Sequence, residues 1–149
     1  MDGDGFIEYQ RENLYGLFHQ SWKDGLKIYI QPPIAMVEIQ GYYYLTYKEF
    51  GLEEKAENLK KKFNEQFWTE DQNYFALALD GKKEQVKVIT SNPGHLLFTG
   101  ILDDDKIEKV VRRLFKDDMW TPYGIRTHSS RDPRFDPESY HQGSIWPHG

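Results

Sequence analysis

The sequence predicts an all-α domain built from helical hairpins, with a small β-hairpin at about residues 73–89. Two observations lead to this fold class. Segments that are apolar on nearly every face alternate with amphipathic segments, as expected when each buried helix is followed by a helix at the surface. Proline and glycine stand at the ends of these segments, where helices begin and end. The alternation favours an array of hairpins over an irregular helical domain.

The first predicted pair of helices covers residues 31–68. Gln31–Phe50 opens with two prolines and is apolar or aromatic on nearly every face, which predicts a buried helix that stops at Gly51. Leu52–Trp68 has Glu and Lys on one face and apolar residues at helical spacing on the other, so we expect an amphipathic helix with one side in water. The apolar positions are Leu52, Ala56, Leu59, Phe63 and Phe67.

The predicted hairpin follows this pair. Asn73–Ile89 has the composition of extended chain, and the dipeptide Asp80-Gly81 is a signal for a type I′ turn between two strands. The hairpin would separate the first pair of helices from a second.

The second predicted pair repeats the plan of the first. Ser91–Leu102 is apolar, with Asn92 as a candidate cap and Pro93 at the first helical position. Asp103–Phe115 is amphipathic, and its acidic start and basic end match the helix dipole. After a loop rich in Asp, Pro and Arg, Ser139–Gly149 predicts the start of a third buried helix.

Composition excludes several classes of protein. The chain has 149 residues, enough for one domain or a part of one. Its net charge of -5 argues against nucleic acid as a partner, and no apolar run reaches the roughly 18 residues that cross a membrane. The first residues lack the basic start and apolar core of a signal peptide, so we expect a cytoplasmic protein. The absence of cysteine rules out disulfides and thiolate metal sites.

Aromatic residues give the first indication of a ligand. They make up 15% of the chain, and many stand beside Gln, Asn, Asp or His rather than in purely apolar runs. Rings mixed with hydrogen-bonding groups suit a site for a flat-faced, hydroxylated molecule such as a sugar. The alternative is that these rings simply fill and cover the core.

Metal sites find little support in the sequence. The segment Asp2–Glu8 resembles the middle of a calcium loop, but Arg11 stands where the bidentate glutamate is required. The histidines do not have the spacing of a zinc site. We therefore expect no metal and no cofactor. Each of three histidines starts an apolar segment, where it could bind a ligand or satisfy backbone groups: His95, His141 and His148.

Two carboxylates stand apart from the solvated helix faces that hold most of the acidic residues. Glu38 lies inside the most apolar predicted helix, where an unpaired charge is costly, so we expect it to meet a cation or a ligand. Asp24 is either a turn residue at the surface or the acid of an active site. Trp22 could supply the apolar wall that a general acid needs, whereas the amine of Lys23 would oppose this effect.

Seven segments, in this order, carry a resemblance to a known group of proteins. They are "GFIEY" (5–9), "GLFHQSWKDG" (16–25), "PIAMVEIQGYYY" (33–44), "YFALALDG" (74–81), "SNPGHLLFTGI" (91–101), "YGIRT" (123–127) and "PESYHQGSIWPH" (137–148). With them, the chain resembles the catalytic domain of bacterial and archaeal amylo-alpha-1,6-glucosidase or glycogen-debranching-like proteins, which are related to mannosylglycerate-hydrolase-like glycosidases. Ser21 and Gly25 depart from the pattern of this group, which has glycine and serine there.

The resemblance implies a fold, a reaction and a set of site residues. The fold is an (α/α)6 toroid of six helical hairpins, of which 149 residues would form a part, truncated at the C-terminus and at the N-terminus. The reaction is glycoside hydrolysis with inversion, with Asp24 as the general acid and a base glutamate beyond this chain. Candidate contacts to an oligosaccharide or glucoside are Trp22, Lys23, Glu38, Gln40, Asn92, His95, Tyr140, His141 and Trp146.

Alternatives remain open beside the glycosidase. A part of a ring would expose apolar faces of its inner helices, so we expect self-association and little catalysis from this chain alone. The changed neighbours of Asp24 slightly favour a catalytically inactive carbohydrate-binding or interaction module. A further possibility is an enzyme of the same fold with another chemistry, such as a sugar epimerase.

Overall fold

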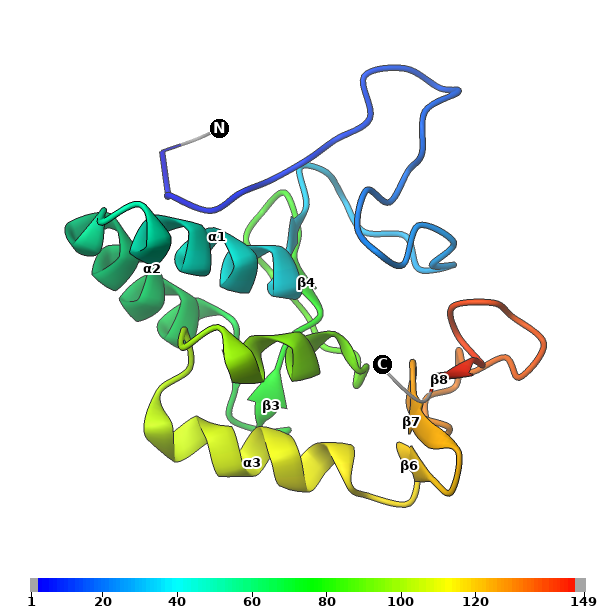
Figure 1. Ribbon diagram of the computed structural model, residues 1–149. Coiled ribbons are helices and arrows are strands. Elements are labelled where there is room, and N and C mark those ends of the chain that lie inside the picture. The colour runs from blue at the N-terminus through cyan, green and yellow to red at the C-terminus, as the bar shows by residue number, and fades with distance from the viewer. Residues whose placement is uncertain (1–2, 147–149) are drawn as a thin grey trace.

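The computed structural model describes residues 3–146 and combines helices with short strands (Figure 1). The helices are α1 (Val37–Glu49), α2 (Glu53–Gln66), the 3-10 helix η1 (Asn92–Phe98) and α3 (Asp104–Leu114). The strands are β1 (Ala35–Met36), β2 (Trp68–Thr69), β3 (Tyr74–Phe75), β4 (Ala78–Leu79), β5 (Gln85–Val86), β6 (Trp120–Thr121), β7 (Gly124–Arg126) and β8 (Ile145–Trp146). None of these helices is long and apolar enough to cross a bilayer.

The expectation of an all-α fold, a partial (α/α)6 toroid, is wrong. The described residues are 31% helical and 15% strand, with the strands in three small sheets. Their sheet orders are β1-β4-β5, β2-β3 and β6-β7-β8. Strands of two or three residues are too short to show the alternation that reveals a strand in a sequence, which is why only one hairpin was expected.

The predicted helix over residues 31–50 begins later than expected. The prolines are followed by β1, which pairs antiparallel with β4, and α1 starts only at Val37. The stop at Gly51 is confirmed, because this glycine adopts a φ of +68° and its N–H donates to the carbonyl of Lys48 at 3.1 Å.

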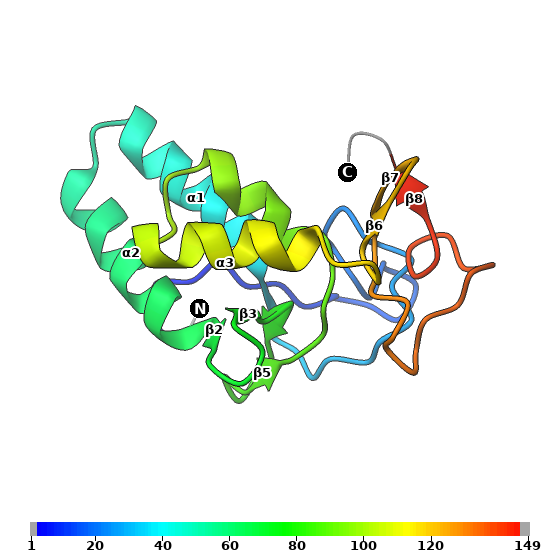
Figure 2. The same cartoon turned by 90° about the horizontal axis from the view of Figure 1, so that it is seen from below.

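The helices pack as two neighbouring pairs. Helix α2 confirms the predicted amphipathic helix and buries Ala56, Leu59 and Phe63 against the core. It packs beside α1, while η1 packs on both α1 and α3. Figures 1 and 2 show these helices gathered on one side of the molecule, with β6, β7 and β8 on the other side beside the N-terminal loop.

The predicted hairpin is confirmed, but its turn differs. Strands β4 and β5 pair antiparallel, with Leu79 opposite Gln85. The loop between them is longer than the two residues of a type I′ turn, and its positive φ lies at Lys83 rather than at Gly81. The Asp80 carboxylate organises this loop by accepting hydrogen bonds from the N–H groups of Lys82 and Glu84 at 2.8 and 2.9 Å.

The two later helical segments have different outcomes. Helix α3 confirms the amphipathic prediction, whereas Ser91–Leu102 forms only the 3-10 helix η1. The third buried helix predicted from Ser139 is wrong within the described residues, because turns there lead into β8, which pairs with β7. The chain doubles back tightly at Gly143, where an added Cβ would lie 2.2 Å from the carbonyl oxygen of Asp136.

Two hydrophobic clusters form the core. The larger one joins α1, α2, η1 and α3 to the strands, with Phe63, Phe67 and Phe75 stacked at its centre. The smaller one packs a segment that follows Asp24 in the sequence against β1, β4 and Val88. Its residues from that segment are Leu26, Ile28, Ile30 and Ile34. Each buried aliphatic side chain contributes about 1.5–3 kcal/mol, so this cluster anchors the loop that carries Asp24.

Candidate active site

The predicted site residues lie mainly where four parts of the chain meet. These parts are the loop around residues 19–28, the first turn of α1, helix η1, and the C-terminal segment that leads into β8. Figures 1 and 2 both show the N-terminal loop, coloured blue to cyan, beside the strands near the C-terminus. Residues more than a hundred positions apart in the sequence therefore contribute to one region.

Asp24 belongs to a turn that its neighbours hold in place. The N–H of Leu26 donates to the carbonyl of Lys23 at 3.1 Å, and the Ser21 hydroxyl accepts from the N–H of Lys23 at 3.3 Å. His19 closes the wider loop with a hydrogen bond between its Nε2 and the carbonyl of Ile28 at 2.8 Å. The side chain of Asp24 is 51% exposed, so this well-anchored turn presents a carboxylate to solvent.

Lys23 points the opposite way and is fully buried. Its Nζ donates to the carbonyl oxygen of Thr127 and lies 4.9 Å from the centre of the Trp22 ring. The N–H of Ser91 donates to the same carbonyl at 3.1 Å. Burial lowers the pKa of Lys23 to about 7, against the opposing effect of the Glu38 carboxylate. Lys23 thus joins the Asp24 turn to the segment of Thr127, which in turn pairs with Ser91.

Glu38, in the first turn of α1, is 1% exposed. Burial raises its pKa, whereas the Asn92 amide and the Lys23 ammonium oppose the rise. Lys23 is the cation whose charge acts on Glu38. Among the described residues, neither carboxylate oxygen of Glu38 has a hydrogen-bond partner. The same holds for the side-chain oxygen and nitrogen of Asn92. These buried, unpartnered polar atoms are unusual in a folded protein.

His141 connects the C-terminal segment to the Asp24 turn. Its Nδ1 accepts a hydrogen bond from the N–H of Gly25 at 2.9 Å and lies 3.6 Å from Oδ1 of Asp24. An Nδ1 that accepts from an amide carries no proton, so the ring is neutral in this arrangement. Burial also lowers the pKa of His141, which the Asp24 carboxylate counteracts. One of the two alternatives for this histidine, the satisfaction of a backbone group, is therefore present.

A cluster of aromatic rings surrounds these residues. The Trp22 ring centre lies 5.6 Å from that of His95, 5.9 Å from that of His141 and 5.2 Å from that of Trp146. Tyr140 extends the cluster, with its ring 4.2 Å from His141 and 5.7 Å from Trp146, and its side chain is largely exposed. A row of rings that ends at the surface can stack on a sugar.

Residues 46–148 match the model of the mannosylglycerate hydrolase MGH1-like glycoside hydrolase domain. The chain belongs to this family. No curated protein matches the sequence.

The match confirms the predicted glycosidase domain and the relation to mannosylglycerate-hydrolase-like proteins. The matched range includes Asn92, His95, Tyr140, His141 and Trp146. Asp24 and Glu38 lie before the first matched residue. The assignments of Asp24 and Glu38 therefore depend on the geometry above and on the resemblance of their own segments.

The side-chain amide of Gln40 is engaged in hydrogen bonds with backbone groups. Its Oε1 accepts from the N–H of Ile7 at 2.9 Å, and its Nε2 donates to the carbonyls of Ile7 at 2.8 Å and Met36 at 3.0 Å. The amide fastens the N-terminal segment to α1, and we leave it out of the proposed site. His148 lies outside the described residues.

Tyr42 is a residue of the site that the sequence reasoning missed. Its hydroxyl lies 2.6 Å from Nδ1 of His95, and its ring packs on Phe98. Tyr42 follows Glu38 by four residues on α1, a spacing that places both on one helical face. That spacing was a usable signal, hidden by the run of three tyrosines in which Tyr42 stands.

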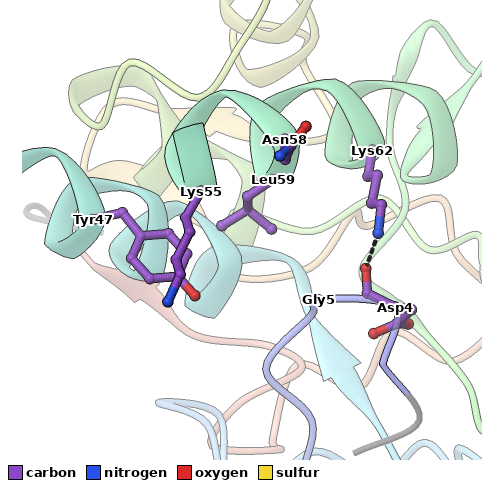
Figure 3. A pocket seen from close by; sticks show the side chains of 7 residues that line it. All are labelled: Asp4, Gly5, Tyr47, Lys55, Asn58, Leu59 and Lys62. Atoms are coloured by element: carbon purple, nitrogen blue, oxygen red, sulfur yellow. Dashed lines mark hydrogen bonds between the residues drawn. The ribbon is translucent and has the colours of Figure 1, made fainter. Parts of the chain in front are cut away.

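A separate pocket of about 230 Å³ lies between the N-terminal segment, α1 and α2 (Figure 3). Figure 3 shows Lys62 extending to the backbone oxygen of Asp4, with which it forms a hydrogen bond of 2.5 Å. None of the predicted site residues lines this pocket, whose lining is Asp4, Gly5, Tyr47, Lys55, Asn58, Leu59 and Lys62. The Lys62 amine therefore already has an acceptor, and we assign the pocket no function.

Proposed function

We propose that this MGH1-like chain carries the general acid of an inverting glycosidase that acts on alpha-linked glucosides, as glycogen-debranching enzymes do. The observation that carries the proposal is the exposed carboxylate of Asp24, held on a turn whose neighbours Lys23 and Gly25 are fixed by buried contacts beside a cluster of aromatic rings. A general acid needs this combination of solvent access and fixed position, because it must reach the leaving oxygen in one geometry.

In the proposed reaction, Asp24 donates its proton to the glycosidic oxygen as the bond from that oxygen to the anomeric carbon breaks. A water molecule attacks the anomeric carbon from the opposite face and loses its proton to a second carboxylate, the base. Inversion requires that the two carboxyl groups stand roughly 6.5–9.5 Å apart, so that the water fits between them. We assign the role of base to none of the described carboxylates, so the test below supplies a nucleophile that needs no base.

The aromatic cluster would hold the sugar. Tyr140, Trp146 and Trp22 offer ring faces for stacking, and His95 and Asn92 offer hydrogen-bonding groups near them. Lys23 and Glu38 are buried, and their charges act on each other. The substrate is accordingly an oligosaccharide or a glucoside.

A carbohydrate-binding module without catalysis is the second candidate. The two departures beside Asp24 favour it, and the structure gives each a physical role. Ser21 caps the turn through its hydroxyl, and a Cβ at Gly25 would lie 2.9 Å from Nδ1 of His141. The serine found here in related proteins would therefore displace that ring.

Isothermal titration calorimetry with isomaltose separates the two candidates when it is combined with a test for bond cleavage. The glycosidase proposal predicts binding together with azide-supported cleavage of phenyl alpha-D-glucopyranoside, in which azide replaces the water and its base. Binding of isomaltose without any such cleavage would favour the binding module. Absence of binding would contradict both.

A further inference from the structure

Two histidines flank the indole of Trp22, and each has its Nδ1 occupied. Nδ1 of His141 faces the N–H of Gly25 at 2.9 Å, and Nδ1 of His95 faces the hydroxyl of Tyr42 at 2.6 Å. The ring centres of the two histidines lie 5.9 and 5.6 Å from that of Trp22. Two histidines near one indole therefore each have a partner at Nδ1, and they come from segments that are far apart in the sequence.

The partner of each Nδ1 determines where the ring proton sits. A backbone N–H can only donate, so Nδ1 of His141 accepts and the proton of the neutral ring is on Nε2. A phenol keeps its proton at neutral pH, and burial with the nearby Glu38 carboxylate raises the pKa of Tyr42 further. The Tyr42 hydroxyl can donate to Nδ1 of His95 or accept from it, and donation would place the His95 proton on Nε2 as well. A ring nitrogen held in this way orients the opposite nitrogen toward a ligand.

The indole N–H of Trp22 is a third donor in this group of rings. Nε1 of Trp22 is buried and has no hydrogen-bond acceptor among the residues that the structure describes. A buried donor without an acceptor is costly, at about 1–3 kcal/mol, unless a bound molecule supplies the acceptor. An indole N–H with two imidazole N–H groups near it suits a ligand that presents several acceptor oxygens.

We propose that Tyr42 and the Gly25 amide hold His95 and His141 as neutral Nε2–H tautomers, so that the site offers a pair of fixed N–H donors to the oxygens of an uncharged sugar. Tyr42 is in this role a positioning residue for His95. The choice of a sugar as the ligand rests on the proposed function, whereas the tautomer of His141 follows from its contact with the Gly25 amide and that of His95 requires the Tyr42 hydroxyl to be the donor.

Charge favours an uncharged ligand over an anionic one. The groups that act electrostatically on the two histidines are Lys23 for both rings and Asp24 for His141. The charge of Lys23 is opposed by Glu38, and the Asp24 carboxylate would repel an anion. A sugar hydroxyl or ring oxygen accepts from N–H donors without this repulsion. Methyl alpha-D-glucopyranoside and D-glucuronate serve as the neutral and anionic probes.

Nitrogen-15 NMR of the histidine rings tests the proposal directly. Spectra at pH 7.5 should show His95 and His141 with a protonated Nε2 and an unprotonated Nδ1. The variant Tyr42→Phe removes the donor to His95, so the ring of His95 should become a mixture of tautomers while that of His141 is unchanged. The matched control Tyr43→Phe removes the neighbouring hydroxyl, which bonds to Tyr47 instead, and should leave both rings as in the wild type.

The sugar titration follows on the same samples. Methyl alpha-D-glucopyranoside should shift the Nε2–H signals of both histidines, and Tyr42→Phe should weaken its binding about threefold to tenfold. D-glucuronate should bind more weakly than the neutral probe. A proton on Nδ1 of either ring, or a Tyr42→Phe spectrum identical to the wild type, would overturn the tautomer assignment. Correct tautomers without a response to the neutral sugar would instead contradict the sugar ligand and, with it, the proposed function.

Discussion

His141 accepts a hydrogen bond from the backbone N–H of Gly25 at 2.9 Å and so joins two segments that are 116 positions apart. The contact leaves no room for a side chain at residue 25, because an added Cβ would lie 2.9 Å from Nδ1 of His141. It also holds the Asp24 carboxylate next to the imidazole. The position of the proposed acid is thus set by a residue near the other end of the chain.

Replacing Gly25 with alanine should disturb this contact. Overpacking of this kind costs about 1–3 kcal/mol, so the free energy of unfolding in urea should fall by that amount and the His141 ring signals should shift. Gly16→Ala is the matched control, because a Cβ there meets its neighbours only at ordinary distances from 3.5 Å. A Gly25→Ala variant as stable as the wild type, with unchanged His141 signals, would show that the contact is not tight.

Lys23 should make the stability depend on pH above neutrality. The pKa of its amine is about 7 in the folded protein and 10.5 in the ordinary state, so between these values the unfolded chain binds more protons. The free energy of unfolding should therefore rise with pH in this window, by at most about 1.4 kcal/mol per pH unit. Urea denaturation of the wild type and of Lys23→Met between pH 7 and 9 measures the effect, since the variant should lose the rise.

Lys27→Met is the control for this prediction. Lys27 is largely exposed and lies four residues away, so its removal should leave the pH dependence as it is. If Lys23→Met and the wild type show the same slope, the buried amine does not titrate in this range.

Tyr140 should contribute to sugar binding through its exposed ring. Stacking of an aromatic ring contributes about 0.5–1.5 kcal/mol, which corresponds to a loss of about twofold to tenfold in affinity for isomaltose in Tyr140→Ala. Tyr123→Ala removes an equally exposed tyrosine outside the cluster and should bind as the wild type does. Equal losses in both variants, measured by calorimetry, would argue against a stacking role specific to Tyr140.

Gln40 should act in folding and not in binding. In Gln40→Met, the N–H and carbonyl of Ile7 lose their partners on α1, which should lower the free energy of unfolding by about 1–3 kcal/mol. The affinity for isomaltose should stay the same. A Gln40→Met variant with wild-type stability but weaker binding would contradict this role and indicate that Gln40 contacts the sugar.

The longer helices were predictable because their apolar residues recur at helical spacing along the sequence. The apolar stripe through Leu59 and Phe63 indicated α2. The acidic start and basic end of α3 indicated where that helix begins and ends. Apart from the hairpin of β4 and β5, the strands were not predictable. Ile145–Trp146 is too short to carry a period and pairs with a strand about 20 residues earlier, a contact that no local pattern encodes. The segment that was expected to start a helix therefore forms a strand.

The site was predictable as a set of residue types and not as a geometry. Glu38 stood out because a carboxylate in an apolar helix needs a partner; in the structure the charge of Lys23 acts on it, but neither carboxylate oxygen has a hydrogen-bond partner among the described residues. The opposite directions of Lys23 and Asp24, one buried and one exposed, depend on where Thr127 and His141 meet the turn. Such contacts between distant segments are set by tertiary packing, which also gave the Gln40 amide its partners on the N-terminal segment.

The most direct test of the account is the azide-supported cleavage of phenyl alpha-D-glucopyranoside by the wild type and by Asp24→Asn. Azide takes the place of the water and its base, so cleavage depends on the acid that protonates the phenol oxygen. The control is Asp71→Asn, which removes an exposed carboxylate from the turn between β2 and β3. We predict that the wild type and the control release phenol and form the beta-glucosyl azide, and that Asp24→Asn is slower by about 10²-fold or more. An Asp24→Asn variant that releases phenol as fast as the wild type would contradict the assignment of Asp24 as the acid.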